Sequence, residues 1–352
     1  MLIGDKRTKV AVNCRWMAKE LTGTERYAAE VTRELLAAGE LDVELRVPAD
    51  AVLPDWAKDA KVVRSRATGM LFEQIVLPLT TLGTHLINLS GPAPLIRRNQ
   101  SVVLFDASVF RYPRTFSAGF VAWYRLLYWV LSRTARHLFT ISEFSATEIA
   151  EVVRVPRLRL IVAPCGADHA TRGTPERPSL NLPSDYVLCV GTLAARKNLL
   201  PTTHALSVAG TNVVVVGAAG KSKVFGAASG LSEAPANLLV AGRLSDGEVN
   251  WLIDNATALV FPSLYEGFGL PVVEAQGRGC PVICADRSSL PEITRGSALM
   301  FDPDHPEAVP RLVAELQNVA GVRESVIANG LENVKRYTWA RTAQIMAGEI
   351  AG

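Results

Sequence analysis

Apolar and polar positions follow a repeated order along this chain: a short apolar run, a loop, and then an amphipathic stretch of helical period. The first example is an apolar run at 9–13, a glycine loop that contains Gly23, and an amphipathic helix expected over 25–36. Further apolar runs predict strands at 43–47, 85–88, 101–105, 138–141 and 159–163. Strands that alternate with helices in this way predict an α/β domain built on a parallel sheet.

A second series of the same kind follows a break in the pattern at 164–168. After this break, the residues up to 184 are rich in Pro, Gly, Thr, Arg and Ser, which is typical of an exposed linker. The second series predicts strands at 186–191, 212–217, 238–241, 258–261, 281–285 and 298–301, with a glycine turn at 217–220 and a final amphipathic helix over 337–350. We therefore expect one doubly wound, Rossmann-like domain over 1–174, a second over 175–336, and a C-terminal helical segment over 337–352.

Composition agrees with two domains of ordinary size. The chain has 352 residues, of which 49% are hydrophobic and 20% are charged, as in soluble globular proteins. No long apolar run is present and the first residues lack the order of a secretory signal, so we expect a cytoplasmic protein without a membrane-spanning helix. The five cysteines are widely scattered without zinc-type spacing, so no metal site is expected.

Two glutamates, Glu266 and Glu274, stand eight positions apart around a glycine turn and an expected helix start. A fully helical spacing would put the two carboxylates about 12 Å apart along the axis, which suits the two ends of a sugar nucleotide. Gly267 and Gly269 would let a ligand approach the backbone, and the N–H groups of the helix start attract anions. The segment is predicted to hold a nucleotide sugar, the alternative being a solvated helix face that carries two acids.

The wider segment 262–275, together with 279–282 and 289–292, resembles the Glu-x7-Glu region of the retaining, two-domain glycosyltransferases of family 4. This resemblance implies the GT-B fold, in which two Rossmann-like domains face each other across a cleft and a C-terminal helix crosses back to the first domain. It implies a nucleoside-diphosphate sugar as substrate and no metal or other cofactor. The donor contacts that it implies are Glu266, Gly267, Phe268, Gly269, Leu270 and Glu274, with Glu266 orienting sugar hydroxyls and Glu274 binding the ribose.

Arg196 and Lys197 follow the strand expected at 186–191 and precede a helix, where two cations can neutralise a departing diphosphate. Two bases at a helix start are unfavourable beside the positive end of the helix dipole, which makes simple surface decoration less attractive. The segment matches the Gly-Thr-Leu-x-x-Arg-Lys-Asn element of the family, which implies that Lys197 first and Arg196 second stabilise the leaving group. Thr192 and Arg243 are also predicted donor contacts. Many members carry an arginine where this chain has Thr192, so one diphosphate contact is either missing or supplied by Arg243.

Arg243 and Leu244 follow the strand expected at 238–241 and resemble the loop that contacts the nucleobase in the family. Ser245 beside them is also a good helix cap, and both interpretations can hold together. Asp302 and Asp304 have the Asp-x-Asp spacing of metal-dependent glycosyltransferases with a different fold, but we interpret them as a turn.

The first domain is expected to hold the acceptor, and its motifs are less specific. The loop that contains Gly23 resembles the one that approaches the donor diphosphate in the family. Glu73 and the segment 106–113 resemble members that build bacterial surface polysaccharides, so we predict acceptor contacts for Glu73, Asp106 and Arg111. Asp106 also has two alternatives, a contact with the donor sugar or a simple turn cap.

A basic, aromatic stretch runs from Arg97 to Arg159, with ten arginines against four acids and a local balance of +6. Its aromatic residues include Phe110, Tyr112, Phe116, Phe120, Trp123, Tyr124, Tyr128 and Trp129. Arginines beside aromatic rings suit an anionic membrane surface. Nucleic acid is a competing partner that we do not expect, because no nucleic-acid-binding motif accompanies the charge. The remaining alternative is a helix over about 117–136 with its aromatics in the core and its arginines solvated.

These observations predict a retaining glycosyltransferase that moves a hexose to a lipid-linked or saccharide acceptor in bacterial cell-surface glycan synthesis. GDP-mannose is the first choice of donor, with dTDP-rhamnose or a UDP-sugar as alternatives, and a peripheral contact with the anionic inner membrane is expected. The family often has His before the Asp of the first domain, and this chain has Phe105. Phe105 and Thr192 therefore leave a second hypothesis, a catalytically weakened protein that binds a nucleotide sugar.

Overall fold

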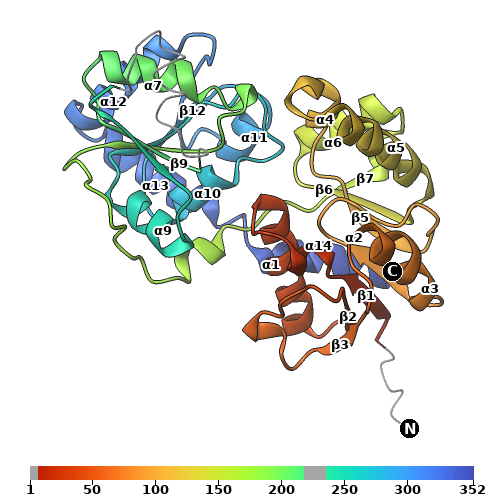
Figure 1. Cartoon of the computed structure of the whole chain (residues 1–352). Coiled ribbons are helices and arrows are strands. Elements are labelled where there is room, and N and C mark those ends of the chain that lie inside the picture. Colours follow the sequence, from red (N-terminus) through yellow and green to blue (C-terminus); the bar gives the residue numbers. More distant parts are fainter. Residues whose placement is uncertain (1–6, 218–234) are drawn as a thin grey trace. The chain divides into compact units, whose positions relative to one another are not determined.

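The computed structural model describes residues 7–217 and 235–352, and it divides into two compact units (Figure 1). The first unit contains the residues up to Gly166 together with Thr338–Gly352, and the second spans Ala167–Tyr337. The division falls earlier than the boundary expected at 174, because the 3-10 turn η6 (Asp168–Thr171) packs on helix α10 (Leu270–Gly277) of the second unit. Most of the glycine turn expected at 217–220 lies outside the described residues.

The first unit is built on a seven-stranded sheet with the order β3-β2-β1-β4-β5-β6-β7, in which every pairing is parallel. Its strands are β1 (Lys9–Asn13), β2 (Asp42–Val47), β3 (Lys61–Arg64), β4 (His85–Asn88), β5 (Gln100–Val103), β6 (His137–Thr140) and β7 (Leu160–Val162). Strands β4 and β5 are buried along their whole length, as expected for a parallel sheet covered on both faces. The strands predicted from apolar runs are present, and β3 is an additional edge strand.

Helices connect these strands and cover the sheet. They are α1 (Gly23–Ala38), α2 (Gly69–Leu71), α3 (Leu77–Thr80), α4 (Ser108–Arg111), α5 (Ala118–Thr134) and α6 (Glu143–Val153), with a π-helical segment η3 (Phe72–Val76) between α2 and α3 and 3-10 turns η1 (Arg15–Ala18), η2 (Asp55–Ala57), η4 (Pro113–Thr115) and η5 (Arg157–Arg159). Helix α5 confirms the helix expected over 117–136. Within the described ranges, no helix combines the length and the apolar composition needed to cross a bilayer.

The C-terminal helix α14 (Trp339–Ala351) belongs to the first unit, where it packs along α1. The Trp339 side chain is fully buried with its ring edge-on to Tyr27, and the Phe105 ring also packs edge-on to Tyr27. A Cβ atom on Gly166 would lie 2.3 Å from the Trp339 nitrogen, so only glycine lets the chain cross the start of α14 here. The expected return of the C-terminal helix to the first domain is confirmed.

The second unit contains a parallel six-stranded sheet with the order β10-β9-β8-β11-β12-β13. Its strands are β8 (Val187–Val190), β9 (Val213–Val216), β10 (Leu238–Gly242), β11 (Ala258–Phe261), β12 (Val282–Ala285) and β13 (Leu299–Phe301). Val187 and Cys189 pack in one core cluster and Leu188 in another, so successive side chains of β8 fill the two faces of the sheet. The two doubly wound Rossmann-like domains predicted from the sequence are confirmed.

The described helices of the second unit are α7 (Leu199–Val208), α9 (Asp246–Asn255), α10, α11 (Leu290–Thr294), α12 (Val309–Asn318) and α13 (Val322–Val334), with 3-10 turns at η6, η7 (Ala195–Lys197) and η8 (Pro306–Ala308). Helix α9 begins with a capping box: the Ser245 hydroxyl accepts from the Glu248 N–H at 3.2 Å, and the Glu248 carboxylate accepts from the Ser245 N–H at 2.9 Å. The helix cap expected at Ser245 is therefore present.

The buried His85 of β4 makes the stability of the first unit depend on pH. Its Nδ1 donates to Asn99 Oδ1 at 2.9 Å, and its Nε2 accepts from the Ser101 hydroxyl at 2.8 Å. Burial lowers the pKa of His85 from 6.5 to about 4, with the nearby His137, Arg136 and Arg97 acting in the same direction and the Asn99 hydrogen bond opposing it. The unfolded chain therefore takes up this proton first as the pH falls.

We expect the neutral, buried His85 to stabilise the folded state at pH 7. This contribution to the free energy of unfolding should be lost as the pH falls from about 6.5 to about 4. By pH 4.5 the loss amounts to about 2 kcal/mol of unfolding free energy. Urea unfolding at the two pH values checks this prediction, because His85→Gln should remove that part of the pH dependence. His204→Gln, on the exposed side of α7, serves as the control. Equal pH dependence of wild type and His85→Gln would contradict the assignment.

Candidate functional site

The loop between β11 and α10 (residues 262–269) holds Glu266 by its backbone as well as by its side chain. The Glu266 N–H donates to Ser288 Oγ at 3.0 Å, and the Ser289 hydroxyl donates to the Glu266 carbonyl at 3.0 Å. Ser288 has a φ of 55°, an uncommon left-handed conformation for a residue with a side chain. Such strained residues concentrate at functional sites. The loop after β12 therefore fixes the position of Glu266.

The glycine turn before α10 has the conformation that its sequence predicts. Gly269 precedes the helix with a φ of 95°, and Pro271 lies in the first turn. A Cβ atom on Gly269 would lie 2.6 Å from Cδ2 of Leu290, which is itself fully buried. The position therefore requires glycine for two reasons, the left-handed backbone and the close approach of Leu290.

Lys197 and Arg196 come together with Glu266, as their places after β8 and β11 predicted. The Lys197 ammonium forms an ion pair with Glu266 Oε1, and Arg196 Nη1 lies 3.9 Å from Glu266 Oε2 and 3.3 Å from the Tyr265 carbonyl. The three side chains are only 11–21% exposed. Two cations and one carboxylate carry a net charge of +1 in a largely desolvated place, where an added anion is attracted strongly.

The 3-10 turn η7 that carries Arg196 and Lys197 is anchored to the neighbouring loops. The Leu264 N–H donates to the Arg196 carbonyl at 2.8 Å, which ties the loop after β8 to the loop after β11. Asn198 follows with a φ of 52° and donates its side-chain amide to the Pro303 carbonyl at 2.9 Å. The two cations are thus positioned by the protein itself before any ligand is bound.

Glu274 lies on α10, and its partner is a histidine that belongs to none of the motifs found in the sequence. The Nε2 atom of His169, in η6, is 2.8 Å from Glu274 Oε1. The His169 side chain is 7% exposed and that of Glu274 is 17% exposed, so the pair is mostly screened from water. In the sequence, only the position of His169 distinguishes it: His169 directly follows Asp168, where the break between the two series of strands ends.

The remaining donor candidates of the second unit lie on loops after strands. Thr192 is exposed two residues after β8, and Arg243 is exposed directly after β10. Leu244 is partly buried against the core cluster of that sheet face. Gly267 and Phe268 are buried in the loop before α10, and Leu270 begins the helix. All of them follow the carboxyl ends of parallel strands, where α/β sheets bind ligands. Their contacts with a donor stay predictions.

The Asp-x-Asp pair of the second unit forms a turn with its own cation. Arg287 Nη2 lies 3.0 Å from Asp302 Oδ1 and 2.6 Å from Asp304 Oδ2. The Asp304 N–H also donates to Asp302 Oδ1 at 3.1 Å. These contacts favour the interpretation of Asp302 and Asp304 as a turn.

In the first unit, Gly23 begins α1, and a Cβ atom there would meet no described atom within 4 Å. Packing of this unit therefore leaves room at Gly23 for a ligand to approach the helix start. Glu73 lies in the π-helix η3 and is 1% exposed, with Arg15 Nη1 at 2.8 Å and the Gln74 amide at 3.0 Å. π-Helical segments are frequent at functional sites, but the buried carboxylate is already paired.

Asp106 and Arg111, the two other acceptor candidates, both have partners within the first unit. Asp106 Oδ1 accepts from the Ser108 N–H at 2.7 Å, which is the turn cap that the sequence left open as an alternative. Arg111 forms two hydrogen bonds with Glu148, at 2.7 and 2.9 Å, and a third with Glu151 at 2.8 Å. These acids raise the pKa of Arg111 above its usual value, and the hydrogen bond that Arg111 donates to Glu148 has the largest effect. Acceptor contacts of Asp106 and Arg111 stay predictions.

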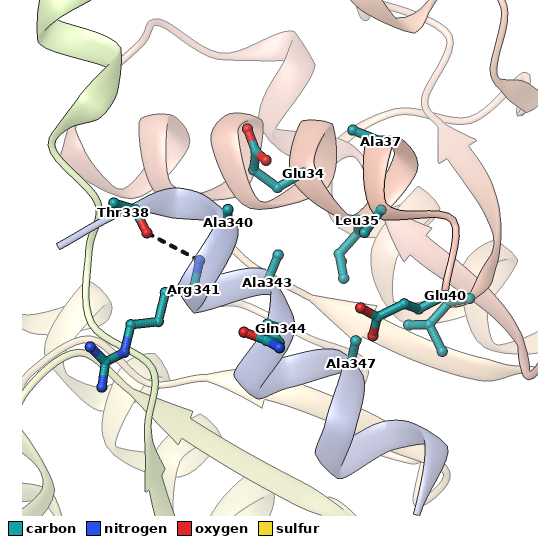
Figure 2. Close-up of a pocket in the computed structure, with 12 residues that line it drawn as sticks. Glu34, Leu35, Ala37, Glu40, Thr338, Ala340, Arg341, Ala343, Gln344 and Ala347 are labelled. Carbon is teal, nitrogen blue, oxygen red and sulfur yellow. Dashed lines mark hydrogen bonds between the residues drawn. The ribbon is translucent and has the colours of Figure 1, made fainter. Parts of the chain in front are cut away.

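A hollow of about 670 Å³ lies between α1 and α14 (Figure 2). Small residues such as Ala343 and Ala347 line it, and the Arg341 N–H donates to the Thr338 hydroxyl at its edge. None of the candidate residues named above lines this hollow. It is therefore separate from the candidate site.

Comparison with known proteins agrees with this geometry. Residues 174–332 match the family described as Glycosyl transferases group 1. The chain is similar to an O-antigen chain mannosyltransferase B of Escherichia coli, with 27% identity over 224 residues that cover 58% of each chain. The chain therefore spans 58% or less of the length of the first curated relatives that it matches. The second unit carries a glycosyl transferases group 1 domain.

Solved structures agree on the fold. Sucrose-phosphate synthase from Thermosynechococcus elongatus superposes with a TM-score of 0.74 at 18% identity, covering 97% of this chain and 98% of that one. HepE of Anabaena, determined in complex with UDP and glucose, superposes with a TM-score of 0.72 at 16% identity, covering 97% and 99%. The pair of Rossmann-like domains is that of the GT-B class.

The fit of Gly269 against Leu290 gives a stability prediction. Gly269→Ala combines a strained left-handed backbone with a clash against a buried side chain, so we expect a loss of about 2–4 kcal/mol. Gly296→Ala is the matched control, because Gly296 has a φ of 81° and open space around its Cβ position. The control should lose only about 1–2 kcal/mol through strain. Thermal unfolding measures both, and equal losses would show that Leu290 yields to the new methyl group.

Proposed function

We propose that this protein is a retaining glycosyltransferase that moves a hexose from a nucleoside-diphosphate sugar to a saccharide or lipid-linked acceptor. The observation that carries the proposal is the pairing of Lys197 and Arg196 with the single carboxylate of Glu266. Their excess positive charge matches a leaving diphosphate. The glycosyl transferases group 1 domain and the similarity to O-antigen mannosyltransferases support transfer of a sugar in bacterial polysaccharide synthesis.

In this mechanism the chain's own cations receive the negative charge that develops on the departing diphosphate. Lys197 and Arg196 are held in place by η7 and by Glu266, so little reorganisation is needed as the bond breaks. The N–H groups at the start of α10 add a positive dipole end after Gly269. The departing phosphate then takes the proton of the incoming hydroxyl. With two cations doing this work, the proposed reaction requires no metal or other cofactor.

Glu266 and Glu274 divide the binding of the donor in this proposal. Glu266 sits beside the cations and orients hydroxyls of the transferred sugar, while Glu274, one helix turn inside α10, binds the ribose. GDP-mannose is the proposed donor because the similar proteins include mannosyltransferases. A UDP-sugar is the alternative, since the similar HepE structure contains UDP and glucose. We place the reaction in the cytoplasm, in contact with the anionic inner face of the membrane that presents a lipid-linked acceptor.

A panel of GDP-, UDP- and dTDP-sugars, tested by thermal shift and by transfer to lipid-linked acceptors, tests the proposal. One donor class should stabilise the wild type. Lys197→Ala should lower kcat by about 100- to 1000-fold, since it removes a preorganised cation, and Glu274→Ala should raise the donor Kd by about 10- to 100-fold through the lost charged hydrogen bonds. Lys335→Ala and Glu332→Ala, an exposed pair at the C-terminal end of α13, are matched controls.

The outcomes of this panel separate the hypotheses. Wild-type kinetics in both Lys197→Ala and Glu274→Ala would remove the site assignment. Donor binding without turnover on any acceptor would favour the weakened nucleotide-sugar-binding protein suggested by Phe105 and Thr192. Phe105 is one of the two residues that raise this alternative, and it is engaged within the first unit. Its ring centroid lies 5.4 Å from that of Tyr27.

His169 is predicted to act through Glu274, as a positioning residue. Removal of its N–H donor should leave the Glu274 carboxylate free to turn, which weakens donor binding before it affects the chemical step. His169→Phe should therefore raise the KM for the donor by about 5- to 20-fold, the effect of one hydrogen bond, with kcat nearly unchanged. His169→Gln, whose amide can still donate, should restore part of the loss, and His204→Gln is the control. An equal fall in kcat for His169→Phe and His169→Gln would contradict the prediction.

A further inference from the structure

A row of large apolar side chains is exposed on the helical crossover between β3 and β4. Segments α2, η3 and α3 run without a break from Gly69 to Thr80 (orange in Figure 1). The exposed side chains, which we name the crossover stripe, are Met70 (45%), Leu71 (60%), Ile75 (52%), Leu79 (61%), Leu82 (72%) and Ile96 (77%). Single exposed apolar residues are ordinary, but four on one segment with two more in the loops that follow mark a surface made for contact.

Helical spacing explains why these side chains form a row. Leu71, Ile75 and Leu79 recur every four positions, so they share one side of the segment. The opposite side supplies Phe72 and Leu77, which are buried in a core cluster with Leu86 of β4. The segment therefore has an inner apolar face that the fold uses and an outer apolar face that no described residue covers.

Ile96 joins the stripe because its loop is tied to the same segment. The Gln74 amide donates to the Ala93 carbonyl at 3.0 Å, and the Leu95 N–H donates to Gln74 Oε1 at 3.1 Å. Arg97 donates to the Thr81 carbonyl at 2.6 Å. These bonds hold the residues on both sides of Ile96 against the helical segment and the turn that follows it.

The exposed charges of residues 61–100, the stretch that contains the crossover stripe, have one sign. Residues 61–100 contain five Lys and Arg and one acid, which is Glu73. Glu73 is 1% exposed and paired with Arg15, so it presents no negative charge at the surface. Arg64, Arg66 and Arg98 are exposed. An apolar face in a stretch of chain that exposes arginines and no acid complements an anionic bilayer, whose interior takes the apolar side chains and whose phosphates attract the arginines.

We propose that the crossover stripe is the membrane-docking surface of this protein and that it binds anionic lipid bilayers. A second copy of the chain fits the stripe less well, because it would bring the same arginines against one another. The purpose of the surface rests on the proposed function, since a lipid-linked acceptor lies in a bilayer. Its binding can be measured without donor or acceptor.

The basic, aromatic stretch expected to meet the membrane is mostly engaged inside the first unit. Trp123, Tyr124 and Phe110 pack against a core cluster. Of the arginines, Arg133 donates to the carbonyls of Trp129 and Val153, and Arg111 pairs with acids as described above. The alternative of a core-packed helix therefore describes most of α5, and Leu126 (48%) and Trp129 (55%) are its most exposed large apolar side chains.

Flotation of the full chain with vesicles tests the proposal. The probes are vesicles of phosphatidylcholine with phosphatidylglycerol at about 30 mol%, against phosphatidylcholine alone, since anionic headgroups supply the attraction for the arginines. The wild type should float with the anionic vesicles. Leu71→Asn with Leu79→Asn should lower the floated fraction by about five-fold or more, because both side chains lose their affinity for the bilayer interior.

Two matched pairs act as controls. Val52→Asn with Leu158→Asn changes side chains of the same unit that are even more exposed, at 80% and 94%, and should leave flotation within about two-fold. Leu126→Asn with Trp129→Asn tests α5 in the same way. Thermal unfolding and the donor-induced thermal shift of the stripe pair should equal those of the wild type, which separates this inference from the proposed enzymatic function.

Several results would overturn the proposal. One is a wild type that does not float, and another is a stripe pair that floats as the wild type does. A loss confined to the α5 pair would assign docking to that helix instead. Concentration-dependent dimerisation that the stripe pair abolishes, without flotation of the wild type, would show that the stripe binds a second copy of the chain.

Discussion

The ion pair between Lys197 and Glu266 is the interaction on which the site in the second unit depends. It joins the loop after β8 to the loop after β11, and the loop after β12 holds the same glutamate through Ser288 and Ser289. A buried carboxylate needs a cation, and removal of Glu266 would leave two largely buried cations without a compensating charge. Arg196 adds a second cation beside the first pair. The arrangement therefore keeps an unmatched positive charge in a rigid frame, which a diphosphate can neutralise without rearranging the protein.

The sequence predicted this gathering because parallel sheets have a simple rule of placement. Residues that directly follow β8, β10, β11 and β12 must lie along one edge of the sheet, whatever the loops do in detail. Strong apolar runs marked the strands, so Arg196, Lys197 and Glu266 could be assigned to that edge. The same signal failed for β3, whose burial pattern is mostly exposed and therefore has no apolar run to detect. Composition also placed the domain boundary too late in the chain. The residues of η6 have the composition of a linker, but they pack on α10 and belong to the second unit.

Side-chain partners were beyond the reach of the sequence. His169 and Glu274 are 105 positions apart and meet only because η6 packs on α10. No local pattern encodes that contact, and His169 by itself is indistinguishable from any buried histidine. Arg111 was assigned to an acceptor by resemblance, whereas its chemistry in the folded chain is governed by Glu148 and Glu151 on α6. A match to a family motif thus predicts where a residue lies better than it predicts whether its charge is available to a ligand.

The membrane question turns on the same difference between composition and exposure. Counting arginines and aromatic rings selected 97–159, but counting cannot tell an inward ring from an outward one. In α5 most rings face the core. The helical segment that carries the crossover stripe, Gly69–Thr80, has Glu73 as its one charged residue and Phe72 as its one aromatic residue, and both are buried. The segment carries apolar residues on both its inner and its outer face, a pattern that by sequence alone is typical of a buried helix. A helical segment that is apolar on two faces and covered on only one of them leaves an apolar surface exposed to water, and a bilayer can cover it.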